Sequence, residues 1–389
     1  MSRIETALIH GAIREGYEDK KGAVNVPMYL SSTFHQESMD EFGEYDYARS
    51  GNPTRAALEK AIAELEGGDR GFAFATGMAA VSACFMLLSK GDHIVITEDV
   101  YGGTYRFVTK VLPRFGITHT FVDFTDLEAV RGAVKTETKL LYMETPSNPT
   151  LGITDIRGIV KIAREINALT FLDNTFMTPI HQRPLALGVD IVIHSATKFL
   201  SGHSDIVAGL VVTKDPSVSE ALYFIQNSFG SVLGVQDSFT LIQNMKTTAV
   251  RFNESSRVAG LIAAFLDGHS LVEKVYYPGL ATHPGYEIHS AQSTSGGAVL
   301  SFTLPSYEIA KAFVEAMKIP VFAVSLGGVE SILSYPAKMS HAAMEPEERA
   351  KRGITDGLLR FSVGLESGDD LIEDFTQALE KATKVAQIK

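Results

Sequence analysis

Residues 169–175 have the sequence LTFLDNT, and residues 190–198 have the sequence DIVIHSATK. Each stretch contains a short run of large apolar residues, as expected for a buried strand, and each ends in polar side chains. Asp173 ends the first run, and Lys198 follows the second. In a parallel sheet, ligands bind in the crevice beyond the carboxyl ends of the strands. We therefore expect Asp173 and Lys198 to face one site.

Similar apolar runs recur along the first part of the chain. Seven of them are strand candidates, at 71–75, 94–97, 117–122, 139–143, 169–172, 189–194 and 208–213. Helical patterns separate several of these runs, at 78–88, 127–134 and 156–166. Strands that alternate with helices predict βαβ units and a mostly parallel sheet covered on both faces.

The pattern changes twice along the 389 residues, which exceed the usual length of one domain. Residues 1–50 are irregular in pattern, and the first helix is expected to begin with Thr54 as its cap and to end at Gly67 and Gly68. Beyond residue 245 we expect helices at 252–267, 309–317 and 371–383, and strands at 298–304, 321–325 and 358–363. The prediction is an N-terminal arm at 1–53, a larger domain at 54–245 and a smaller C-terminal α/β domain at 246–389.

Composition argues against several functions. The net charge of −11 disfavours nucleic acid and anionic membranes as partners. No apolar stretch approaches ~18 residues, and the first residues lack the apolar core of a signal peptide, so we expect no membrane span and a cytoplasmic location. The single cysteine, Cys84, lies in an apolar helical stretch and is expected to be buried. It rules out an internal disulfide and a Cys-x-x-Cys metal site, and we expect no metal.

Several common catalytic signatures are missing from the sequence. We find no G-x-G-x-x-G, no G-x-x-x-x-G-K-[ST], no H-E-x-x-H and no G-x-S-x-G. These absences disfavour an NAD-dependent dehydrogenase of the usual kind, nucleotide hydrolysis, zinc hydrolysis and serine hydrolysis.

The polar residues at the strand ends instead suit pyridoxal phosphate (PLP). A desolvated lysine such as Lys198 has a free amine that can form a Schiff base with an aldehyde. Ser195 and Thr197 offer hydroxyls to a phosphate, and Gly77 lies in a strand-to-helix turn whose N–H groups suit an anion. The carboxylate of Asp173 would keep the pyridine nitrogen protonated, so that the ring acts as an electron sink.

Residues 195–205, SATKFLSGHSD, resemble the cofactor-lysine signature of the Cys/Met-metabolism (trans-sulfuration) PLP enzymes. This family includes cystathionine γ-synthases, β-lyases and γ-lyases and methionine γ-lyase. The resemblance covers nearly the whole chain, with further matches at 47–54, 99–104, 144–149 and 325–331. Among subfamilies, the chain looks most like the cystathionine β-lyases of Bacillus-type bacteria, through 233–237 and 352–360.

The resemblance implies the PLP-dependent transferase fold type I, which is aspartate-aminotransferase-like, with a seven-stranded, mostly parallel sheet. It implies β-elimination of L-cystathionine to homocysteine, pyruvate and ammonia; the alternative is a γ-lyase or γ-synthase on the same scaffold. Lys198 would be the catalytic base, and Tyr101 would stack on the cofactor and assist proton transfer. The implied cofactor-binding residues are Tyr47, Arg49, Gly77, Met78, Tyr101, Asn148, Asp173, Ser195, Thr197 and Lys198. The implied substrate-binding residues are Asn148, Ser325 and Arg360, the last of which would clamp the substrate α-carboxylate.

Three features of the resemblance bear on partners and substrate. Tyr47 and Arg49 match residues that reach the phosphate of a neighbouring subunit, which predicts a homo-oligomer, a tetramer of two site-sharing dimers. Methionine γ-lyases carry a cysteine where this chain has Gly103, which argues against methionine as the preferred substrate. Glu330 resembles a position associated with γ-chemistry, but both lyases and synthases can carry glutamate there. The substrate is expected to be a small sulfur-containing amino acid, and Glu330 does not decide between the two reactions. A non-catalytic PLP-binding protein is disfavoured, because the lysine, aspartate, tyrosine and arginine are all present.

Overall fold

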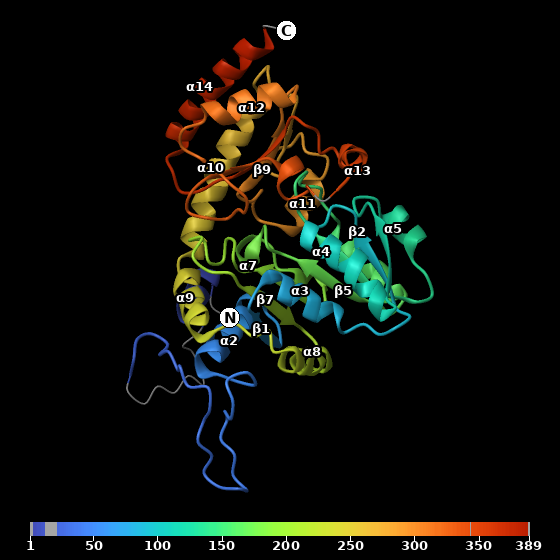
Figure 1. The fold of residues 1–389 in the computed structure, drawn as a ribbon, viewed down its shortest axis with the longest axis vertical. Coiled ribbons are helices and arrows are strands. Elements are labelled where there is room, and N and C mark those ends of the chain that lie inside the picture. The colour runs from blue at the N-terminus through green and yellow to red at the C-terminus, as the bar shows by residue number, and fades with distance from the viewer. Residues whose placement is uncertain (1–2, 12–21, 343, 388–389) are drawn as a thin grey trace.

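The structure is a computed structural model that describes residues 3–11, 22–342 and 344–387. Its described part contains two sheets, each flanked by helices. The second half of the chain lies over one end of the first half (Figure 1). The larger sheet has the strand order β1-β7-β6-β5-β4-β2-β3. Its strands are β1 Arg70–Phe74, β2 His93–Thr97, β3 Thr118–Val122, β4 Thr138–Glu144, β5 Leu169–Asp173, β6 Ile191–Ser195 and β7 Gly209–Thr213.

This larger sheet is mostly parallel, as the sequence predicted. Only β7 runs against its neighbours β1 and β6, while the other strands pair in parallel. Alternate residues of β6 pack on opposite faces, Val192 in one hydrophobic cluster and Ile191 and Ile193 in another. Burial on both faces explains why each of these strands is a nearly continuous apolar run.

Helices cover this sheet and supply the N-terminal segment. They are α1 Ile4–His10, α2 Pro53–Glu66, α3 Gly77–Phe85, α4 Gly102–Arg106, α5 Leu127–Ala133, α6 Ile156–Glu165, α7 Thr178–His181, α8 Pro216–Phe229 and α9 Val235–Met245. The helix α1 corrects the expectation that residues 1–50 are irregular throughout; Ala7 and Leu8 bury its apolar side in the core. Cys84 is buried in α3, as predicted.

The start of α2 corrects another prediction. The N-cap is Asn52, whose side chain accepts hydrogen bonds from the N–H groups of Thr54 and Arg55. Pro53 occupies the first helical position, where its fixed φ is favourable, so the helix begins before Thr54. The Thr54 hydroxyl instead donates to Pro27 O, 2.8 Å away. At the other end Gly67 has φ 73° and closes the helix, as predicted.

The second half of the chain forms a five-stranded sheet in the order β10-β11-β12-β9-β8. Its strands are β8 Lys274–Tyr276, β9 Val299–Thr303, β10 Val321–Phe322, β11 Ile332–Ser334 and β12 Leu358–Ser362. Its helices are α10 Thr248–Asp267, α11 Tyr286–Gln292, α12 Tyr307–Ala316, α13 Pro346–Lys351 and α14 Gly368–Ala386. The sequence predicted β9, β10 and β12 but missed β8 and β11, and β10 covers only Val321–Phe322 of the predicted 321–325.

The long helix α10 runs from beside the larger sheet up to the smaller one (Figure 1). The predicted boundary at 245/246 falls between α9 and α10, and the one at 53/54 falls at the start of α2. Both stay predictions about independently folding units. None of the helices in the described ranges combines the length and apolar character that a bilayer span requires. Those ranges also hold no group of three or more His, Cys, Asp or Glu residues placed to bind a metal.

Candidate active site

A cavity of about 690 Å³ lies at the carboxyl ends of β4, β5 and β6, where residues of the second half of the chain close over it. Ten of the predicted site residues line it: Gly77, Met78, Tyr101, Asn148, Asp173, Ser195, Thr197, Lys198, Ser325 and Arg360. Tyr47 and Arg49 do not line it. The cavity is where the strand-end rule places a ligand in an α/β sheet.

Lys198 lies in the turn after β6 and points its amine at the second half of the chain. Its Nζ donates a hydrogen bond to Ser325 Oγ at 2.5 Å. Burial, and secondly the charge of Arg360, lowers the pKa of Lys198 to about 8. Gly327, with φ 81°, allows its loop to lie close to the backbone after Lys198, because a Cβ at this position would lie 2.7 Å from Phe199 N. The amine is therefore held in place and poised to lose its proton near neutral pH.

Ser325 is held in an unusual backbone conformation. Its φ is 86°, in the left-handed region that serine rarely adopts. Such a conformation costs on the order of 1–3 kcal/mol and persists where the surroundings fix it. Here Arg360 Nη2 donates to Ser325 O at 2.7 Å, while Lys198 engages the hydroxyl. Ser325 thus links the amine and the guanidinium of the site.

Arg360 reaches the cavity from the middle of β12, a strand of the smaller sheet. It is 4% exposed, so the sequence-based expectation that it is not a surface arginine is correct. Besides Ser325, it donates to Asn148 Oδ1 at 2.8 Å and Ser334 Oγ at 3.2 Å, while its buried Nε has no partner in the described part of the chain. Burial lowers the pKa of Arg360 to about 10, which still leaves it charged near neutral pH. A guanidinium with neutral oxygens around it suits an anionic ligand such as a carboxylate.

Two carboxyl groups lie side by side at the ends of β4 and β5, Glu144 buried and Asp173 half-buried. Glu144 and Asp173 are partners in the parallel register, and both line the cavity. Burial first, and Asp173 second, raises the pKa of Glu144 well above its usual range. Burial also raises the pKa of Asp173, but hydrogen bonds from Thr175 oppose that shift. Burial therefore favours the neutral form of Glu144, while the hydrogen bonds from Thr175 favour the charged form of Asp173.

Glu144 was missed as a site residue. It ends its strand as Asp173 does, so the strand-end rule could have found it. Its Oε2 accepts a hydrogen bond from Tyr101 N at 2.9 Å and so fixes the backbone that carries the tyrosine ring.

A Cβ on Gly103 would lie 2.6 Å from Tyr101 Cε1 and 2.7 Å from Met78 Sδ. A cysteine at Gly103 would therefore require Tyr101 or Met78 to move.

An anion cradle lies at the start of α3. Thr76 caps this helix by accepting from Ala79 N at 2.8 Å, and the N–H groups of the first turn end at the cavity wall. A Cβ on Gly77 would come within 3.0 Å of Ser195 Cβ and Oγ, so glycine lets the turn approach β6 closely. Thr197 Oγ1 is held at the same wall by Ala208, whose N–H donates to it at 3.0 Å.

Tyr47 and Arg49 lie instead in the arm before α2. Arg49 Nη1 donates to Asn227 O at 2.6 Å and to Asn227 Oδ1 at 2.9 Å, on α8. Tyr47 is 48% exposed. One chain does not bring these two side chains to its own cavity, and their assignment to a neighbouring subunit stays a prediction.

The sequence profile of the family described as "Cys/Met metabolism PLP-dependent enzyme" matches residues 5–380. The chain belongs to this family. It is 61% identical to the cystathionine β-lyase MetC of Bacillus subtilis (strain 168) over 98% of each protein. It is 50% identical to the cystathionine γ-lyase of the same organism, over 97% of this chain and 99% of that one.

A solved member of the Cys/Met-metabolism family has the same fold. The crystal structure of a cystathionine γ-lyase from Lactobacillus plantarum, complexed with L-serine, matches with a TM-score of 0.95 at 46% identity. The match covers 98% of this chain and 100% of that one. The fold is therefore that of the fold type I PLP enzymes, as the resemblance implied.

The residues of the cavity fit the cofactor that this family uses. Lys198 presents an amine of lowered pKa, which suits the aldehyde of PLP. Asp173 is a half-buried carboxyl group whose charged form would favour a protonated pyridine nitrogen, and the turn at Gly77 offers N–H groups to a phosphate. Arg360, with its unpartnered Nε, remains for the carboxylate of an amino-acid substrate.

Proposed function

We propose that the chain is a PLP-dependent carbon–sulfur lyase that cleaves L-cystathionine by β-elimination. The products are homocysteine, pyruvate and ammonia. The observation that carries the proposal is one cavity in which Lys198, Asp173 and Arg360 converge, in a chain 61% identical to a cystathionine β-lyase over nearly its full length. Composition alone could not have distinguished this reaction from others of the same family.

The proposed reaction begins with orientation of the substrate. Arg360 holds the substrate α-carboxylate through its charged, planar donor group, supported by Asn148 and Ser325. Bound PLP supplies an electron sink for the electrons of the broken Cα–H bond. Asp173 holds the proton on the pyridine nitrogen, which keeps that sink effective. Residues of both halves of the chain line the cavity, which brings these groups together around the substrate.

Proton transfer is the task of Lys198. Because burial lowers its pKa to about 8, a larger fraction of its amine is unprotonated near neutral pH than in an exposed lysine, and this amine removes the substrate Cα proton as general base. The Cβ–S bond then breaks, and homocysteine leaves after its sulfur gains a proton. Tyr101, the residue just before α4, assists proton transfer at the substrate amine. Water converts the remaining three-carbon fragment into pyruvate and ammonia, which balances the reaction.

The decisive test is product analysis on cystathionine. β-Elimination gives pyruvate and homocysteine, whereas γ-elimination gives 2-oxobutyrate and cysteine. We expect pyruvate to be the main oxo acid from the purified, cofactor-loaded enzyme, measured by chromatography with both standards. A majority of 2-oxobutyrate would overturn the proposal in favour of the alternative.

That alternative is a cystathionine γ-lyase or γ-synthase on the same scaffold. The 50% identity to a γ-lyase and the solved γ-lyase structure support it. Glu330, the position associated with γ-chemistry, is exposed and does not line the cavity. The crowding at Gly103 weighs against a cysteine-assisted methionine γ-lyase. A panel of cystathionine, methionine and O-substituted homoserines would rank these activities directly.

We also propose a homotetramer built from two site-sharing dimers, with Tyr47 and Arg49 reaching the partner subunit's phosphate. Their exposure on the arm supports this. Mixing Arg49→Ala chains with Lys198→Ala chains should restore activity, because one site in the mixed dimer has both an intact Lys198 and an intact Arg49. No recovery despite proven subunit exchange would contradict shared sites. The cytoplasmic location stays a prediction, which cell fractionation would test.

A further inference from the structure

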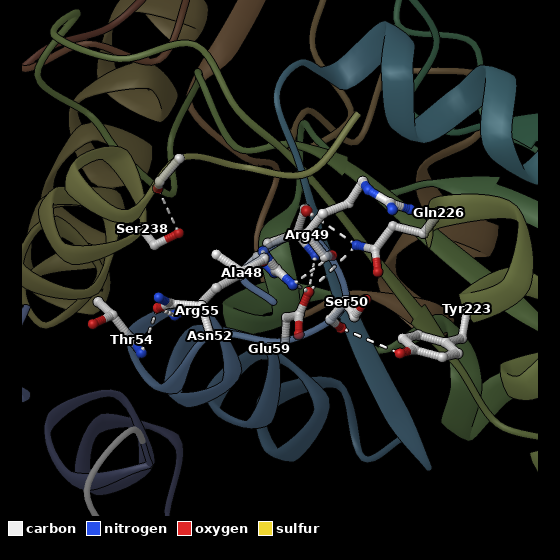
Figure 2. A network of polar contacts seen from close by, with 12 residues as sticks. Ala48, Arg49, Ser50, Asn52, Thr54, Arg55, Glu59, Tyr223, Gln226 and Ser238 are labelled. Carbon is white, nitrogen blue, oxygen red and sulfur yellow. Dashed lines mark hydrogen bonds and ion pairs between the residues drawn. The ribbon is translucent and has the colours of Figure 1, made fainter. Parts of the chain in front are cut away.

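The arm is attached to the body of the protein through a buried arginine at the start of α2. Arg55 is 3% exposed. Its Nη1 donates to Ala48 O at 2.7 Å, and its Nη2 donates to Arg49 O at 3.1 Å (Figure 2). The guanidinium thus grips two consecutive carbonyl groups of the arm. A charged group is costly to bury unless it is paired, so this arrangement needs a counter-charge.

Glu59 provides that counter-charge from the next turn of α2. Its Oε1 lies 3.5 Å from Arg55 Nε. The same oxygen accepts from Ala73 N at 2.9 Å, in β1, and from Gln226 Nε2 at 3.4 Å, in α8. The pair is therefore anchored to the larger sheet and to a covering helix, and Figure 2 shows it between them and the arm.

The helix α8 holds the arm from the other side. Tyr223 OH donates to Ser50 O at 3.3 Å, and Asn227 accepts hydrogen bonds from Arg49 and from Ser50 Oγ. Contacts to α2 and α8 thus fix the carbonyl groups of three consecutive residues, 48–50. Tyr47, just before this segment, keeps a 48% exposed side chain. Both hydrogen bonds of Arg49 use Nη1, so its remaining donors are available to another acceptor.

We propose that Arg55 is a positioning residue for the cofactor site of the partner subunit. It fixes the backbone of the arm so that Tyr47 and Arg49 are presented in one direction, toward the partner subunit's phosphate. This inference rests on the proposed donation of the arm between subunits. Arg55 itself touches neither cofactor nor substrate, and its effect passes through the carbonyls of Ala48 and Arg49. Its loss therefore weakens the partner's site rather than its own.

Two variants separate the hydrogen bonds that Arg55 donates to the carbonyl groups from its positive charge. Arg55→Met keeps an apolar stem of similar length but removes every donor. Arg55→Lys keeps the charge, but its single ammonium lacks the planar fork that spans two carbonyls and Glu59. Arg257→Met is the matched control, since Arg257 pairs with Glu254 on α10 at 2.7 Å but is exposed and far from the arm's contacts. We expect cofactor binding to weaken about tenfold in Arg55→Met homo-oligomers, the scale of losing one charge-assisted contact.

The test measures the PLP dissociation constant by titrating cofactor-free protein. Differently tagged Arg55→Met and Lys198→Ala chains are exchanged, and mixed dimers are purified. In these dimers the site with an intact Lys198 belongs to the Arg55→Met chain and receives an arm from the Lys198→Ala chain, which has an intact Arg55. We expect this site to regain wild-type affinity within about twofold, a change well under 1 kcal/mol. Arg257→Met should match wild type throughout.

Specific outcomes would overturn the inference. Mixed dimers whose Lys198 site stays as weak as in the Arg55→Met protein would show that Arg55 acts within its own chain. Unchanged affinity in the Arg55→Met protein would show no positioning role, and if that variant does not fold, Arg55→Lys answers the same two questions. Parallel dimers of Arg49→Ala with Lys198→Ala chains separate the two levels of proposal. If these also fail to recover, the shared site is wrong; if only the Arg55 pair fails, the shared site stands and the positioning role falls.

Discussion

The cavity at the strand ends and the arm before α2 carry charged groups in opposite ways. In the cavity the side chain of Lys198 is half-buried and that of Arg360 is buried, and burial lowers the pKa of each. In the arm it is the backbone that is held, by Arg55 and α8, while the side chain of Arg49 is exposed. The difference suggests a division of labour. Lys198 and Arg360, which act on the substrate, line a cavity of their own chain, whereas Arg49, proposed to contact the partner subunit's phosphate, is exposed.

The largest effect should come from removing the enclosed base. Lys198→Ala should lower turnover of cystathionine by about 10⁴-fold or more, the upper end of the contribution of a positioned general base. Lys311→Ala, at an exposed lysine that pairs with Glu315, should leave turnover unchanged. Mass spectrometry after borohydride reduction should place the cofactor on Lys198. Labelling of another lysine would mean that the chemistry does not belong to this turn after β6.

Arg360 should have the next largest effect, expressed in substrate binding. Arg360→Ala should lower kcat/KM by about 30-fold to a few thousand-fold, equivalent to about 2–5 kcal/mol for a buried charged contact. The loss should appear mainly in KM, with little change in the dissociation constant of PLP. Steady-state kinetics and cofactor titration together measure this split. If the affinity for PLP falls as much as the affinity for substrate, Arg360 binds the cofactor and not the substrate.

The two carboxyl groups offer a comparison inside the cavity. Asp173→Asn should lower kcat by about 10²-fold, because an amide cannot hold the proton of the pyridine nitrogen. Glu144→Gln should cost much less, since burial raises the pKa of Glu144 and so favours its neutral form, and an amide oxygen can still accept from Tyr101 N. Stopped-flow and steady-state rates of both variants test the order. Equal losses would show that the charge is not on Asp173.

Arg49 tests the exposed side of the comparison. Arg49→Ala should raise the dissociation constant of PLP by about ten- to a hundredfold, the scale of a lost hydrogen bond between charged groups. Turnover at saturating PLP should fall far less, because the arm carries no protonation step. Titration of cofactor-free protein, followed by kinetics in excess PLP, separates the two quantities. A fall in turnover that excess PLP does not reverse would mean that Arg49 contributes to the reaction itself and not only to cofactor binding.

The smallest effect is the pH dependence of Lys198 itself. The folded chain lowers the pKa of this lysine from 10.5 to about 8, so in cofactor-free protein its acetylation should rise with pH around 8. Between these values the unfolded chain binds more protons, so this lysine's contribution to stability rises with pH and is lost as pH falls through 8. Competitive labelling read by mass spectrometry measures the midpoint, with the urea-unfolded chain as control. A folded midpoint near 10.5 would mean that the amine is not desolvated.

The sequence predicted the larger sheet better than the smaller one. Its strands are buried on both faces, so each appears as an uninterrupted apolar run. In the smaller sheet β8 and β11 have three residues each and were missed. The cap of α2 was misplaced by two residues, because Thr54 and Asn52 are both good caps and only the position of Pro53 in the helix decides between them. Local pattern is strong where strands are buried on both faces and weaker in the smaller sheet.

The sequence by itself predicted that Asp173 ends one strand, that Lys198 follows another and that both face one site, since strand ends follow from local apolar runs and ligands bind beyond the carboxyl ends of parallel strands. Only the tertiary structure decided how the groups act on one another. The lowered pKa of Lys198 depends on burial and on the charge of Arg360, and the raised pKa of Glu144 depends on burial and on its neighbour Asp173. Desolvation and charge–charge interaction depend on distance in space, and residues far apart in sequence set both.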